Sequence, residues 1–526
     1  MNSEWQSRRR ARVARDPRFD GKFFVGIVTT RIYCRPSCPV PTVPDKNVRY
    51  FLSAAAAAEA GYRPCLRCRP ECSPGTPAWL GTSATVSRAL RLIAESDLQD
   101  GGIERLAERL GVGSRHLRRL FLTHLGATPG AVVQTRRLHF AKKLIDETNL
   151  PMSEVALAAG YGCVRRFNAT IRQVYQRTPT QIRRLARQSG SQPENRYEFR
   201  LRFRPPFQWQ HILAFLAPRA TPGVEAVDAG IYRRSISLGG THGWFEVSLD
   251  EGNHSLAVRV QFSDPRSLFF ICERLRAMFD LNADWIAIVS ALRASPFLVA
   301  RVDAAPGLRV PGCWDGFELA TRAIIGQQIS VKGATALAGR LVREFGKSPC
   351  FAACPPNRVT HIFPTPEILA DGNLIRAGLT TARAQAIRAL ARAVCDRRIS
   401  FEGVVDSDAF QARLCEIPGI GWWTAQYVAM RALGDPDAFP SSDLGLLRAS
   451  GLGNFRDLES HAEAWRPWRA YGAMYLWSLA GDDRASRKSS RAGSRSSRGA
   501  PPLPGELPPR RSRWINRRPG PHQRVG

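Results

Sequence analysis

Four cysteines near the start of the chain constrain its fold more than any other feature. Cys34 and Cys38 form a C-x3-C pair, and Cys65 and Cys68 form a C-x2-C pair. Two such pairs offer four thiolates to one tetrahedral zinc ion, and a purely structural zinc site is the simplest interpretation of the spacing. The sequence therefore predicts a small zinc-bound module over residues 1–75, which ends in a stretch rich in Pro and Gly.

The composition indicates a large, basic, multidomain protein. The chain has 526 residues, enough for three or four domains with separate cores. Lys and Arg outnumber Asp and Glu by 76 to 45, so the net charge of +31 favours a polyanionic partner, nucleic acid first; a generally Arg-rich composition is the alternative. We find no apolar signal segment and no run of membrane-spanning length, so we expect a cytoplasmic, nucleoid-associated protein without membrane contact.

The residues around the cysteines resemble a known family. The runs TTRIYCRPSC from Thr29 and GYRPCLRCRP from Gly61 are similar to the N-terminal domain of the Ada family of bacterial alkylation-response proteins. In that family the first cysteine of the quartet is both a zinc ligand and the nucleophile that takes a methyl group from a methylated DNA phosphate. The resemblance therefore implies Cys34 as the methyl acceptor and one zinc ion held by Cys34, Cys38, Cys65 and Cys68.

The implied chemistry is physically consistent. Zinc keeps a bound cysteine deprotonated, and the thiolate is the nucleophilic form. Methylation of one sulfur removes a negative charge beside polyanionic DNA, so we expect it to strengthen DNA binding as an electrostatic switch. Arg31 stands where the family usually has Gly, and it either perturbs the loop or adds a phosphate contact. A zinc site with a structural role alone is the alternative.

A helical region follows over residues 82–187, where apolar residues recur at i, i+3 and i+4. Its segments 103–121 and 152–168 each combine a short helix, a Gly-containing turn and an Arg-rich second helix, the pattern of a helix-turn-helix. Two in tandem resemble the DNA-binding domain of the AraC family, which implies promoter DNA and RNA polymerase as partners. Cys163 stands where that family commonly has a Ser N-cap, so we expect a weaker cap. The implied DNA contacts are Arg115, His116, Arg118, Arg119, Arg165, Arg166 and Asn168.

Alternation of polar and apolar residues marks a different architecture over residues 195–313. The stretches Tyr197–Phe203 and Phe245–Leu249 are typical of strands, whereas Leu268–Phe279 and Trp285–Ala294 are typical of helices. The sequence predicts a small antiparallel sheet with helices on one face.

The second chemical signature is the run IPGIGWWTAQY from Ile417 to Tyr427. It predicts a tight turn between two helices, in which Gly419 and Gly421 let backbone N–H groups approach a DNA phosphate without reading base sequence. Alone, this pattern is also typical of any tight helical turn.

Three further runs give the turn its context: FELATRAIIGQQISV from Phe317, DAFPSSDLGL from Asp437 and RPWRAYGAMYLW from Arg466. They resemble the AlkA family, 3-methyladenine DNA glycosylase II, which implies an all-α helix-hairpin-helix domain over 314–482. The resemblance implies Asp443 as the catalytic carboxylate, with a helix N-cap or surface charge as the alternative. The implied substrate pocket is formed by Trp423, Tyr427 and Trp477, for which core packing is the alternative. The implied DNA contacts here are Gln328, Gly419, Gly421 and Thr424.

Base excision sets the chemical demands on this site. Cleavage of the N-glycosidic bond of an alkylated purine develops positive charge on the sugar, which a carboxylate near C1′ stabilises. The nucleotide must be flipped out of the stack, and an electron-rich aromatic pocket favours cationic bases. Trp423 stands where glycosylases that also cut the backbone have a lysine, which implies a monofunctional hydrolase. Gln328 stands where an AlkA member has an apolar wedge, so insertion into DNA is weaker or differently shaped.

The resemblances also indicate which other cofactors and activities to expect and which to exclude. No four-cysteine cluster follows the glycosylase region, so no iron–sulfur centre is expected, while a monovalent cation at the hairpin is a further candidate. The P-C-H-R motif of the O6-alkylguanine transferase half of Ada is absent, so we expect no repair of O6-methylguanine. Residues 483–526 are too polar and Pro-rich to fold, and they form either a DNA-tethering tail or a passive disordered end.

Together these patterns predict a multidomain α+β protein. A zinc-bound α/β module, an all-α tandem helix-turn-helix domain, an antiparallel sheet domain and an all-α helix-hairpin-helix glycosylase domain follow one another. We expect a bifunctional alkylation-damage protein that excises 3-methyladenine and 7-methylguanine from double-stranded DNA in base excision repair and activates transcription of repair genes. The alternative is a transcription regulator alone, whose second half is a non-catalytic DNA-binding platform.

Overall fold

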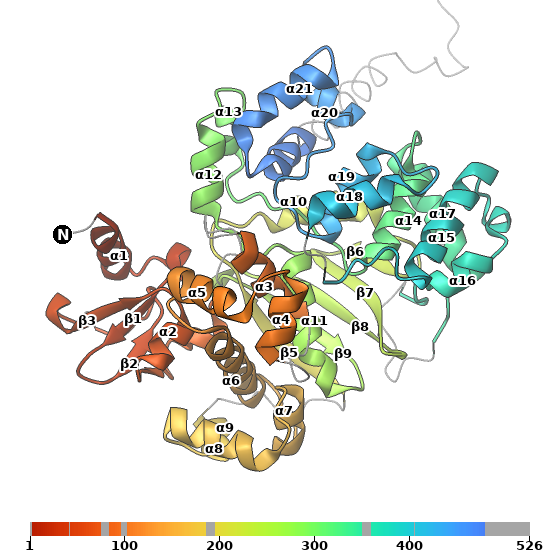
Figure 1. Ribbon diagram of the computed structural model, residues 1–526. Coiled ribbons are helices and arrows are strands. Elements are labelled where there is room, and N and C mark those ends of the chain that lie inside the picture. The colour runs from red at the N-terminus through yellow and green to blue at the C-terminus, as the bar shows by residue number, and fades with distance from the viewer. Residues whose placement is uncertain are drawn as a thin grey trace, which may run out of the picture. The chain divides into compact units, whose positions relative to one another are not determined.

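The computed structural model describes residues 3–41, 43–74, 84–95, 102–185, 195–349, 359–403 and 406–478 (Figure 1). The expected basic tail, residues 483–526, lies outside these ranges. No described helix is long and apolar enough to cross a membrane. The fold class is confirmed, because a sheet module, a helical region, a sheet domain and a second helical region follow one another (Figure 1). The domain bounds drawn from the sequence stay a prediction.

The N-terminal module contains α1 (Ser3–Val13), β1 (Phe24–Ile27), β2 (Ile32–Cys34), β3 (Val48–Phe51), α2 (Ala54–Glu59) and β4 (Arg63–Pro64). Its sheet has the strand order β3-β1-β2-β4, in which β2 and β4 are parallel and the other pairs antiparallel. A Cβ at Gly26 would lie 2.5 Å from the ring of Phe51, so this strand position requires a residue without a side chain.

The helical region contains α3 (Ala84–Glu95), α4 (Gly102–Arg109), α5 (Ser114–Leu125), α6 (Pro129–Glu147), α7 (Met152–Ala158), α8 (Val164–Tyr175) and α9 (Pro179–Leu185). α4 with α5 and α7 with α8 form the two expected helix-turn-helix units. Gly111 and Gly160 in their turns have φ angles of +67° and +75°, a backbone conformation that glycine adopts without strain. Leu117 in α5 and Phe167 in α8 are fully buried and anchor the second helix of each unit.

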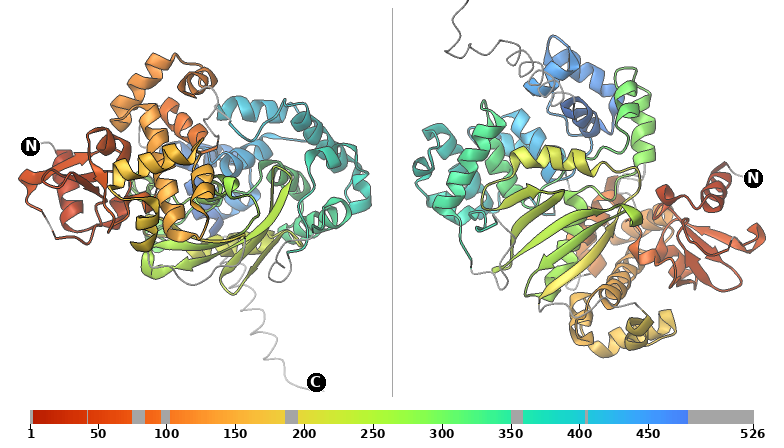
Figure 2. Two further views of the ribbon diagram at one scale, coloured as in Figure 1. Left: turned by 90° about the horizontal axis from the view of Figure 1, so that it is seen from below. Right: turned by 180° about the vertical axis from the view of Figure 1, so that it is seen from behind.

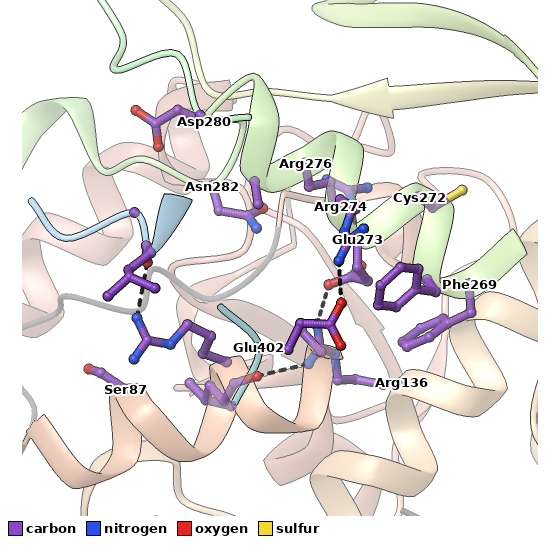
Figure 3. A pocket seen from close by; sticks show the side chains of 18 of the residues that line it. Ser87, Arg136, Phe269, Cys272, Glu273, Arg274, Arg276, Asp280, Asn282 and Glu402 are labelled. Atoms are coloured by element: carbon purple, nitrogen blue, oxygen red, sulfur yellow. Dashed lines mark hydrogen bonds and ion pairs between the residues drawn. The ribbon is translucent and has the colours of Figure 1, made fainter. Parts of the chain in front are cut away.

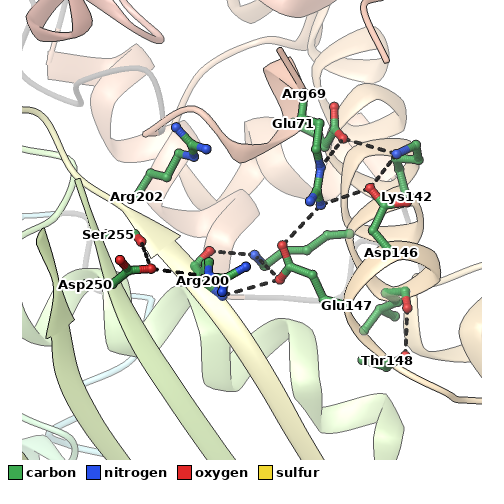
Figure 4. Close-up of polar contacts among 12 residues, drawn as sticks. Arg69, Glu71, Lys142, Asp146, Glu147, Thr148, Arg200, Arg202, Asp250 and Ser255 are labelled. Carbon is green, nitrogen blue, oxygen red and sulfur yellow. Dashed lines mark hydrogen bonds and ion pairs between the residues drawn. The ribbon is translucent and has the colours of Figure 1, made fainter. Parts of the chain in front are cut away.

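A buried polar cluster joins the N-terminal module to α6 (Figure 4). Glu71 pairs with Arg69 and with Lys142, each at 3.4 Å. Arg69 also pairs with Asp146 at 2.9 Å and with Glu147 at 3.1 Å, both near the end of α6. Burial alone would raise the pKa of Glu71, but the charges of Lys142 and Arg69 outweigh it, so this pKa lies below its usual value. Charge pairing therefore fixes the module against α6.

The sheet domain contains β5 (Arg196–Arg202), α10 (Trp209–Leu216), the 3-10 helix η4 (Ala217–Arg219), β6 (Glu225–Asp228), β7 (Ile231–Leu238), β8 (Thr241–Asp250), β9 (Ser255–Gln261), α11 (Leu268–Met278), α12 (Trp285–Arg293) and α13 (Val299–Ala304). Its five strands are antiparallel and lie side by side in the order β5-β9-β8-β7-β6 (Figure 2). The predicted antiparallel sheet and both predicted helices are confirmed.

The second helical region contains α14 (Gly316–Gly326), α15 (Val331–Phe345), α16 (Pro366–Asp371), α17 (Thr381–Cys395), α18 (Ser407–Cys415), α19 (Trp422–Ala432), α20 (Leu444–Ser450), α21 (Phe455–Ala462) and a helix over 469–478. A buried ion network ties the sheet domain to α14. Arg234 on β7 pairs with Glu225 at 3.0 Å and with Glu318 on α14. Arg322 pairs with the same two carboxylates at 2.8 Å and 3.0 Å.

Candidate functional site

The four cysteine sulfurs lie within 4.8 Å of one another, and all four residues are buried. Cys34 ends β2 and Cys65 directly follows β4, and because these strands are parallel neighbours their ends meet. Cys38 and Cys68 follow after the short turns that the C-x3-C and C-x2-C spacings allow. This set of four soft thiolate donors fits one tetrahedral zinc ion.

Asp20 holds the loop that follows Cys34. Its carboxylate accepts hydrogen bonds from the Arg35 guanidinium at 3.0 Å, from the Ser37 N–H at 3.1 Å and from the Ser37 hydroxyl at 2.7 Å. The backbone carbonyl of Asp20 accepts a hydrogen bond from Arg204, just after β5, at 2.9 Å. The cysteine loop is therefore supported from the sheet domain as well as from its own module.

Arg31 lies in the turn between β1 and β2 with a φ angle of +53°. This left-handed conformation costs an L-residue roughly 1–2 kcal/mol and costs glycine nothing. The Arg31 guanidinium lies 5.3 Å from the centroid of the Tyr62 ring, a cation–π contact that offsets part of this cost. The turn thus keeps a glycine-type conformation with an arginine in place.

The predicted DNA contacts of the helix-turn-helix units lie on exposed helix faces. Arg115, His116, Arg118 and Arg119 are exposed on α5, as are Arg165, Arg166 and Asn168 on α8. In both helices these side chains flank the buried anchor residue, so the two units present equivalent faces. Cys163 caps α8 through its sulfur, which accepts the Arg166 N–H at 3.4 Å, a longer and weaker bond than a Ser hydroxyl provides.

The two hairpin glycines have different structural roles. Gly419 has a φ angle of +87°, and a Cβ there would stand 2.7 Å from the Cβ of Ala386. Gly421 has a φ angle of −94°, and nothing lies within 4 Å of its missing Cβ. Gly419 is therefore required by the turn itself, whereas Gly421 leaves open space beside the N-terminus of α19.

The loop between α14 and α15 is attached to the hairpin through Gln327. Its side-chain amide donates hydrogen bonds to the Gly419 carbonyl and to the Thr424 hydroxyl, each at 3.0 Å. Thr424 is buried, so its side chain serves this attachment. The next residue, Gln328, is exposed and has a φ angle of +57°, so the loop projects it outward in a strained conformation.

Asp443 is the N-cap of α20 and also accepts two indole N–H donors. Its Oδ1 accepts the backbone N–H groups of Gly445 at 2.8 Å and Leu446 at 3.0 Å, and Nε1 of Trp477 at 3.0 Å. Its Oδ2 accepts Nε1 of Trp423 at 3.0 Å. The N-cap interpretation is thus correct, but it does not explain the two tryptophans. Four donors fix the orientation of a carboxylate that is only half-buried.

The three predicted pocket aromatics lie together beside this carboxylate. Trp423 and Tyr427 stack with ring centroids 5.4 Å apart and planes within 8°, and Tyr427 meets Trp477 edge-on at 6.3 Å. All three are half-buried. They therefore form an accessible aromatic surface, and Asp443 lies at its edge.

The sequence prediction missed three side chains that adjoin this surface. The ring of Phe215 in α10 lies 6.3 Å from that of Trp477, and the Arg219 guanidinium carbon lies 3.9 Å from the Phe215 ring centroid. Arg431 donates a hydrogen bond to the Tyr427 hydroxyl at 2.7 Å. No motif surrounds Phe215 and Arg219 in the sequence, whereas Arg431 lies four residues after Tyr427 in α19, a helical spacing that could have indicated it.

The two guanidinium groups make this end of the aromatic surface electropositive. Burial alone would raise the pKa of Tyr427, but the charges of Arg431 and Arg219 outweigh it, so its pKa lies below the usual value. The aromatic surface expected to favour cationic bases thus has a positive potential at one end.

A cavity of about 800 Å³ lies between α3, α6 and α11, and Asp443 is not among the residues that line it (Figure 3). Ion pairs cross it, with Arg136 and Glu273 at 2.5 Å and Arg274 and Glu402 at 2.6 Å. The first pair joins the helix-turn-helix region to the sheet domain, and the second joins the sheet domain to the second helical region. The cavity contains none of the aromatic residues of the Asp443 site.

Comparison with known families supports three parts of the chain. Family models match residues 7–71 as the metal binding domain of Ada, 106–185 as a helix-turn-helix domain and 198–315 as the AlkA N-terminal domain. The chain is 32% identical over 284 residues to DNA-3-methyladenine glycosylase 2 of Escherichia coli, covering 53% of this chain and 96% of the relative. It is 36% identical over 136 residues to the bifunctional transcriptional activator/DNA repair enzyme Ada of the same organism, covering 26% of this chain and 36% of that protein.

Nearly the whole chain is also covered by similarity to a bifunctional protein. A probable bifunctional transcriptional activator/DNA repair enzyme AlkA of Mycobacterium tuberculosis is 41% identical over 484 residues, which cover 91% of this chain and 97% of the relative. The Ada match and the cysteine geometry agree on a zinc ion held by Cys34, Cys38, Cys65 and Cys68. The chain belongs to the family of bifunctional transcriptional activators and DNA repair enzymes of the AlkA type, with an Ada-type metal-binding domain.

Proposed function

We propose that this protein releases alkylated purines, such as 3-methyladenine and 7-methylguanine, from double-stranded DNA in base excision repair, and that Asp443 is its catalytic residue. The observation that carries this proposal is the carboxylate itself, held by two indole and two backbone N–H donors at the edge of an aromatic surface. An N-cap needs no indole donors, whereas a catalytic carboxylate must be held in one orientation.

The geometry supports a dissociative hydrolysis. A base flipped out of the duplex stacks against Trp423, Tyr427 and Trp477, and the sugar then lies beside Asp443. The C1′–N bond breaks with its electron pair going to the base, and the carboxylate stabilises the positive charge that develops on the sugar. Water adds to C1′ and gives up a proton to solvent. Trp423 supplies no amine for a Schiff base, so cleavage stops at the abasic site.

For the N-terminal half, we propose that Cys34 accepts a methyl group from a DNA methylphosphotriester. Bound zinc keeps the cysteines as thiolates. The Cys34 sulfur forms a bond to the methyl carbon while the carbon–oxygen bond to the phosphate breaks, and the oxygen keeps the electron pair. The module loses one negative charge, its attraction to DNA increases, and transcription of repair genes is activated.

The DNA contacts and the domain division are part of the same proposal. We assign promoter binding to the exposed faces of α5 and α8, and contact with damaged DNA to the hairpin glycines and Gln328. Residues 1–75, 82–187, 195–313 and 314–482 form the four folded parts, and 483–526 the tail. The protein acts in the cytoplasm on nucleoid DNA, with RNA polymerase as a partner at its promoters.

The first test separates an enzyme from a DNA-binding platform. Purified wild-type protein and Asp443→Asn are incubated with alkylated duplex DNA, and free 3-methyladenine and 7-methylguanine are quantified. We expect release by wild type, a loss of about 100-fold or more in the variant, and similar affinity of both for the duplex. Absence of release by wild type, with DNA binding intact, would support a regulator without glycosylase activity.

The second test addresses the sensor. The protein is incubated with a duplex carrying a methylphosphotriester, and the mass of each cysteine peptide is measured. We expect one added methyl group on the peptide containing Cys34, followed by tighter binding to promoter DNA. Cys34→Ser controls for transfer to the other cysteines. An unmethylated Cys34 would leave the zinc site with a structural role only.

A further inference from the structure

Asp20 joins the loop beside the methyl-acceptor cysteine to the sheet domain. Its carboxylate accepts three hydrogen bonds from the acceptor loop, residues 35–37, which directly follows Cys34. On its other side, the Asp20 carbonyl accepts a hydrogen bond from the Arg204 guanidinium at 2.9 Å. A single residue thus connects the acceptor loop to a domain of the glycosylase half.

Arg204 is a buried bridge between these two parts of the chain. Only 1% of its surface is exposed. Besides the Asp20 carbonyl, its guanidinium donates to the carbonyls of Asn282 at 2.7 Å and Ala283 at 3.4 Å, just before α12. The Arg204 carbonyl in turn accepts a hydrogen bond from Arg309 at 2.9 Å. The sheet domain therefore fixes the guanidinium, and the guanidinium fixes the backbone at Asp20.

The next two residues belong to the same attachment. A Cβ at Gly21 would lie 3.0 Å from the Arg204 guanidinium and 2.0 Å from the Pro74 carbonyl oxygen, so the backbone passes where no side chain fits. Lys22 then pairs at 2.8 Å with Asp284, the buried N-cap of α12. A close approach and an ion pair with a buried carboxylate thus accompany the hydrogen bond from Arg204.

Methyl transfer demands a defined orientation of the acceptor sulfur. The Cys34 sulfur must approach the methyl carbon from the side opposite the carbon–oxygen bond. The new sulfur–carbon bond forms as that bond breaks, and the oxygen keeps the electron pair, so the phosphotriester becomes a diester. Because the DNA is held by the protein, a displacement of the sulfur by about 1 Å slows such a reaction strongly.

We propose that Arg204 is a positioning residue for methyl transfer to Cys34, so that the sensor of this protein depends on its glycosylase half. This inference rests on the methyl-acceptor function proposed above. Arg204 acts through Asp20 and the acceptor loop. Loss of its guanidinium lets the loop shift and leaves all four cysteines in the chain to hold zinc.

The experiment compares two methyl donors with the full-length, zinc-loaded protein. A duplex that carries a methylphosphotriester requires an oriented sulfur, whereas free methyl iodide can approach a thiolate from any open direction. The mass of the Cys34 peptide gives the rate of methylation by each donor. Hydrogen–deuterium exchange of residues 35–37 reports the order of the acceptor loop without any donor. Thermal unfolding and the content of bound zinc check that each variant keeps its fold and its metal.

Two substitutions of Arg204 are compared with a matched control. Arg204→Met removes the guanidinium at similar length. Arg204→Lys keeps the charge without the guanidinium fork, and it serves the same comparison where Arg204→Met does not fold. Arg309→Met is the control, because Arg309 is as deeply buried, at 2% exposed, and also donates to backbone carbonyls. Its acceptors all belong to the sheet domain: the carbonyls of Arg204, Pro206, Gly307 and Leu308.

We expect Arg204→Met to slow transfer from the DNA methylphosphotriester by about tenfold and to leave the reaction with methyl iodide unchanged. Faster hydrogen exchange of the acceptor loop should accompany this loss. Arg204→Lys should lie between Arg204→Met and wild type, and Arg309→Met should match wild type with both donors.

Three results would contradict this expectation. An unchanged rate with the DNA donor in Arg204→Met would overturn the proposal. Equal slowing with both donors would make Arg204 a structural residue and overturn it as well, as would equal slowing by Arg309→Met. By contrast, a wild-type Cys34 that takes a methyl group from methyl iodide and none from the duplex would overturn the proposed methyl-acceptor function itself.

Discussion

At the scale of single residues, the two oxygens of Asp443 have different surroundings. Oδ1 accepts three hydrogen bonds, from two backbone N–H groups and from Trp477. Oδ2 accepts one described hydrogen bond, from Trp423. The capping bonds and Trp477 thus hold the carboxylate in place, and Oδ2 keeps an open lone pair for the positive sugar.

This arrangement predicts a catalytic effect for the indole N–H of Trp477. Trp477→Phe keeps an aromatic ring in the pocket and removes one donor, so we expect the single-turnover rate to fall about tenfold with little change in DNA affinity. Trp465→Phe is the control, since the Trp465 indole donates to Ser295 in the core at 3.1 Å. A similar rate loss in both variants would attribute the effect to packing.

The sequence could predict Asp443 and the three aromatics because they lie in local motifs that resemble a known family. It could not predict Phe215 and Arg219. They come from α10 and η4, in a different domain, and no pattern of residue types distinguishes them from ordinary core and surface positions. Their proximity to Trp477 and Tyr427 arises only from tertiary packing.

At the scale of elements, the hairpin glycines look alike in sequence and differ in structure. Gly419 alone has a positive φ angle and a close neighbour. We expect Gly419→Ala to destabilise the protein by about 2 kcal/mol or more, through backbone strain and the clash with Ala386. Gly421→Ala should change stability by less than about 0.5 kcal/mol and still weaken DNA binding, because its Cβ occupies the approach of a phosphate. Thermal unfolding and DNA titration of both variants separate these effects, and equal stabilities would contradict the assignment.

The second recognition helix offers a test of its cap. Cys163→Ser replaces a sulfur acceptor at 3.4 Å by a hydroxyl, so we expect a gain of roughly 0.5–1 kcal/mol in the free energy of unfolding. Cys163→Ala removes the acceptor and should lower the free energy of unfolding. Urea unfolding followed by circular dichroism measures both, and a serine variant less stable than wild type would contradict the capping interpretation.

Helices and strands with a clear hydrophobic period could be predicted closely, as for Leu268–Phe279, which matches α11 within a residue. The loop conformations could not. The strained backbone at Gln328 and the attachment through Gln327 depend on Gly419 and Thr424, which come from a distant part of the chain. Periodicity carries no information about such contacts.

At the scale of the whole molecule, the N-terminal module and the regions after it share polar contacts. The Tyr33 hydroxyl and a ring nitrogen of His139 on α6 are 2.8 Å apart, and Lys22 pairs with Asp284 at 2.8 Å. Sequence patterns could not predict these contacts, because each joins single residues from different domains. They fix the N-terminal module against α6 of the helical region and against the start of α12 in the sheet domain.

His139 makes the contact between the N-terminal module and α6 sensitive to pH. Burial lowers the pKa of His139 to about 4, while an unfolded histidine titrates near 6.5, so only the unfolded state gains a proton between these values. The contribution of neutral His139 to the free energy of unfolding is fully present above about pH 6.5. It is lost as the pH falls toward 4, and the loss is roughly 1–2 kcal/mol at pH 5. His139→Gln cannot titrate, so its thermal midpoint should fall less than that of wild type between pH 7.5 and 5. An equal fall in the thermal midpoints of wild type and His139→Gln over this pH range would contradict the prediction.

The central claim is that Asp443 acts on the glycosidic bond and does more than cap a helix. Asp406 offers a matched comparison, because it caps α18 by accepting two backbone N–H groups at 3.0 Å, with no indole donor among the residues that the structure describes. The most direct measurement is the single-turnover release of 3-methyladenine by Asp443→Asn and by Asp406→Asn. The account predicts a loss of about 100-fold or more in the first and near wild-type release in the second. Equal rates for the two variants would contradict it.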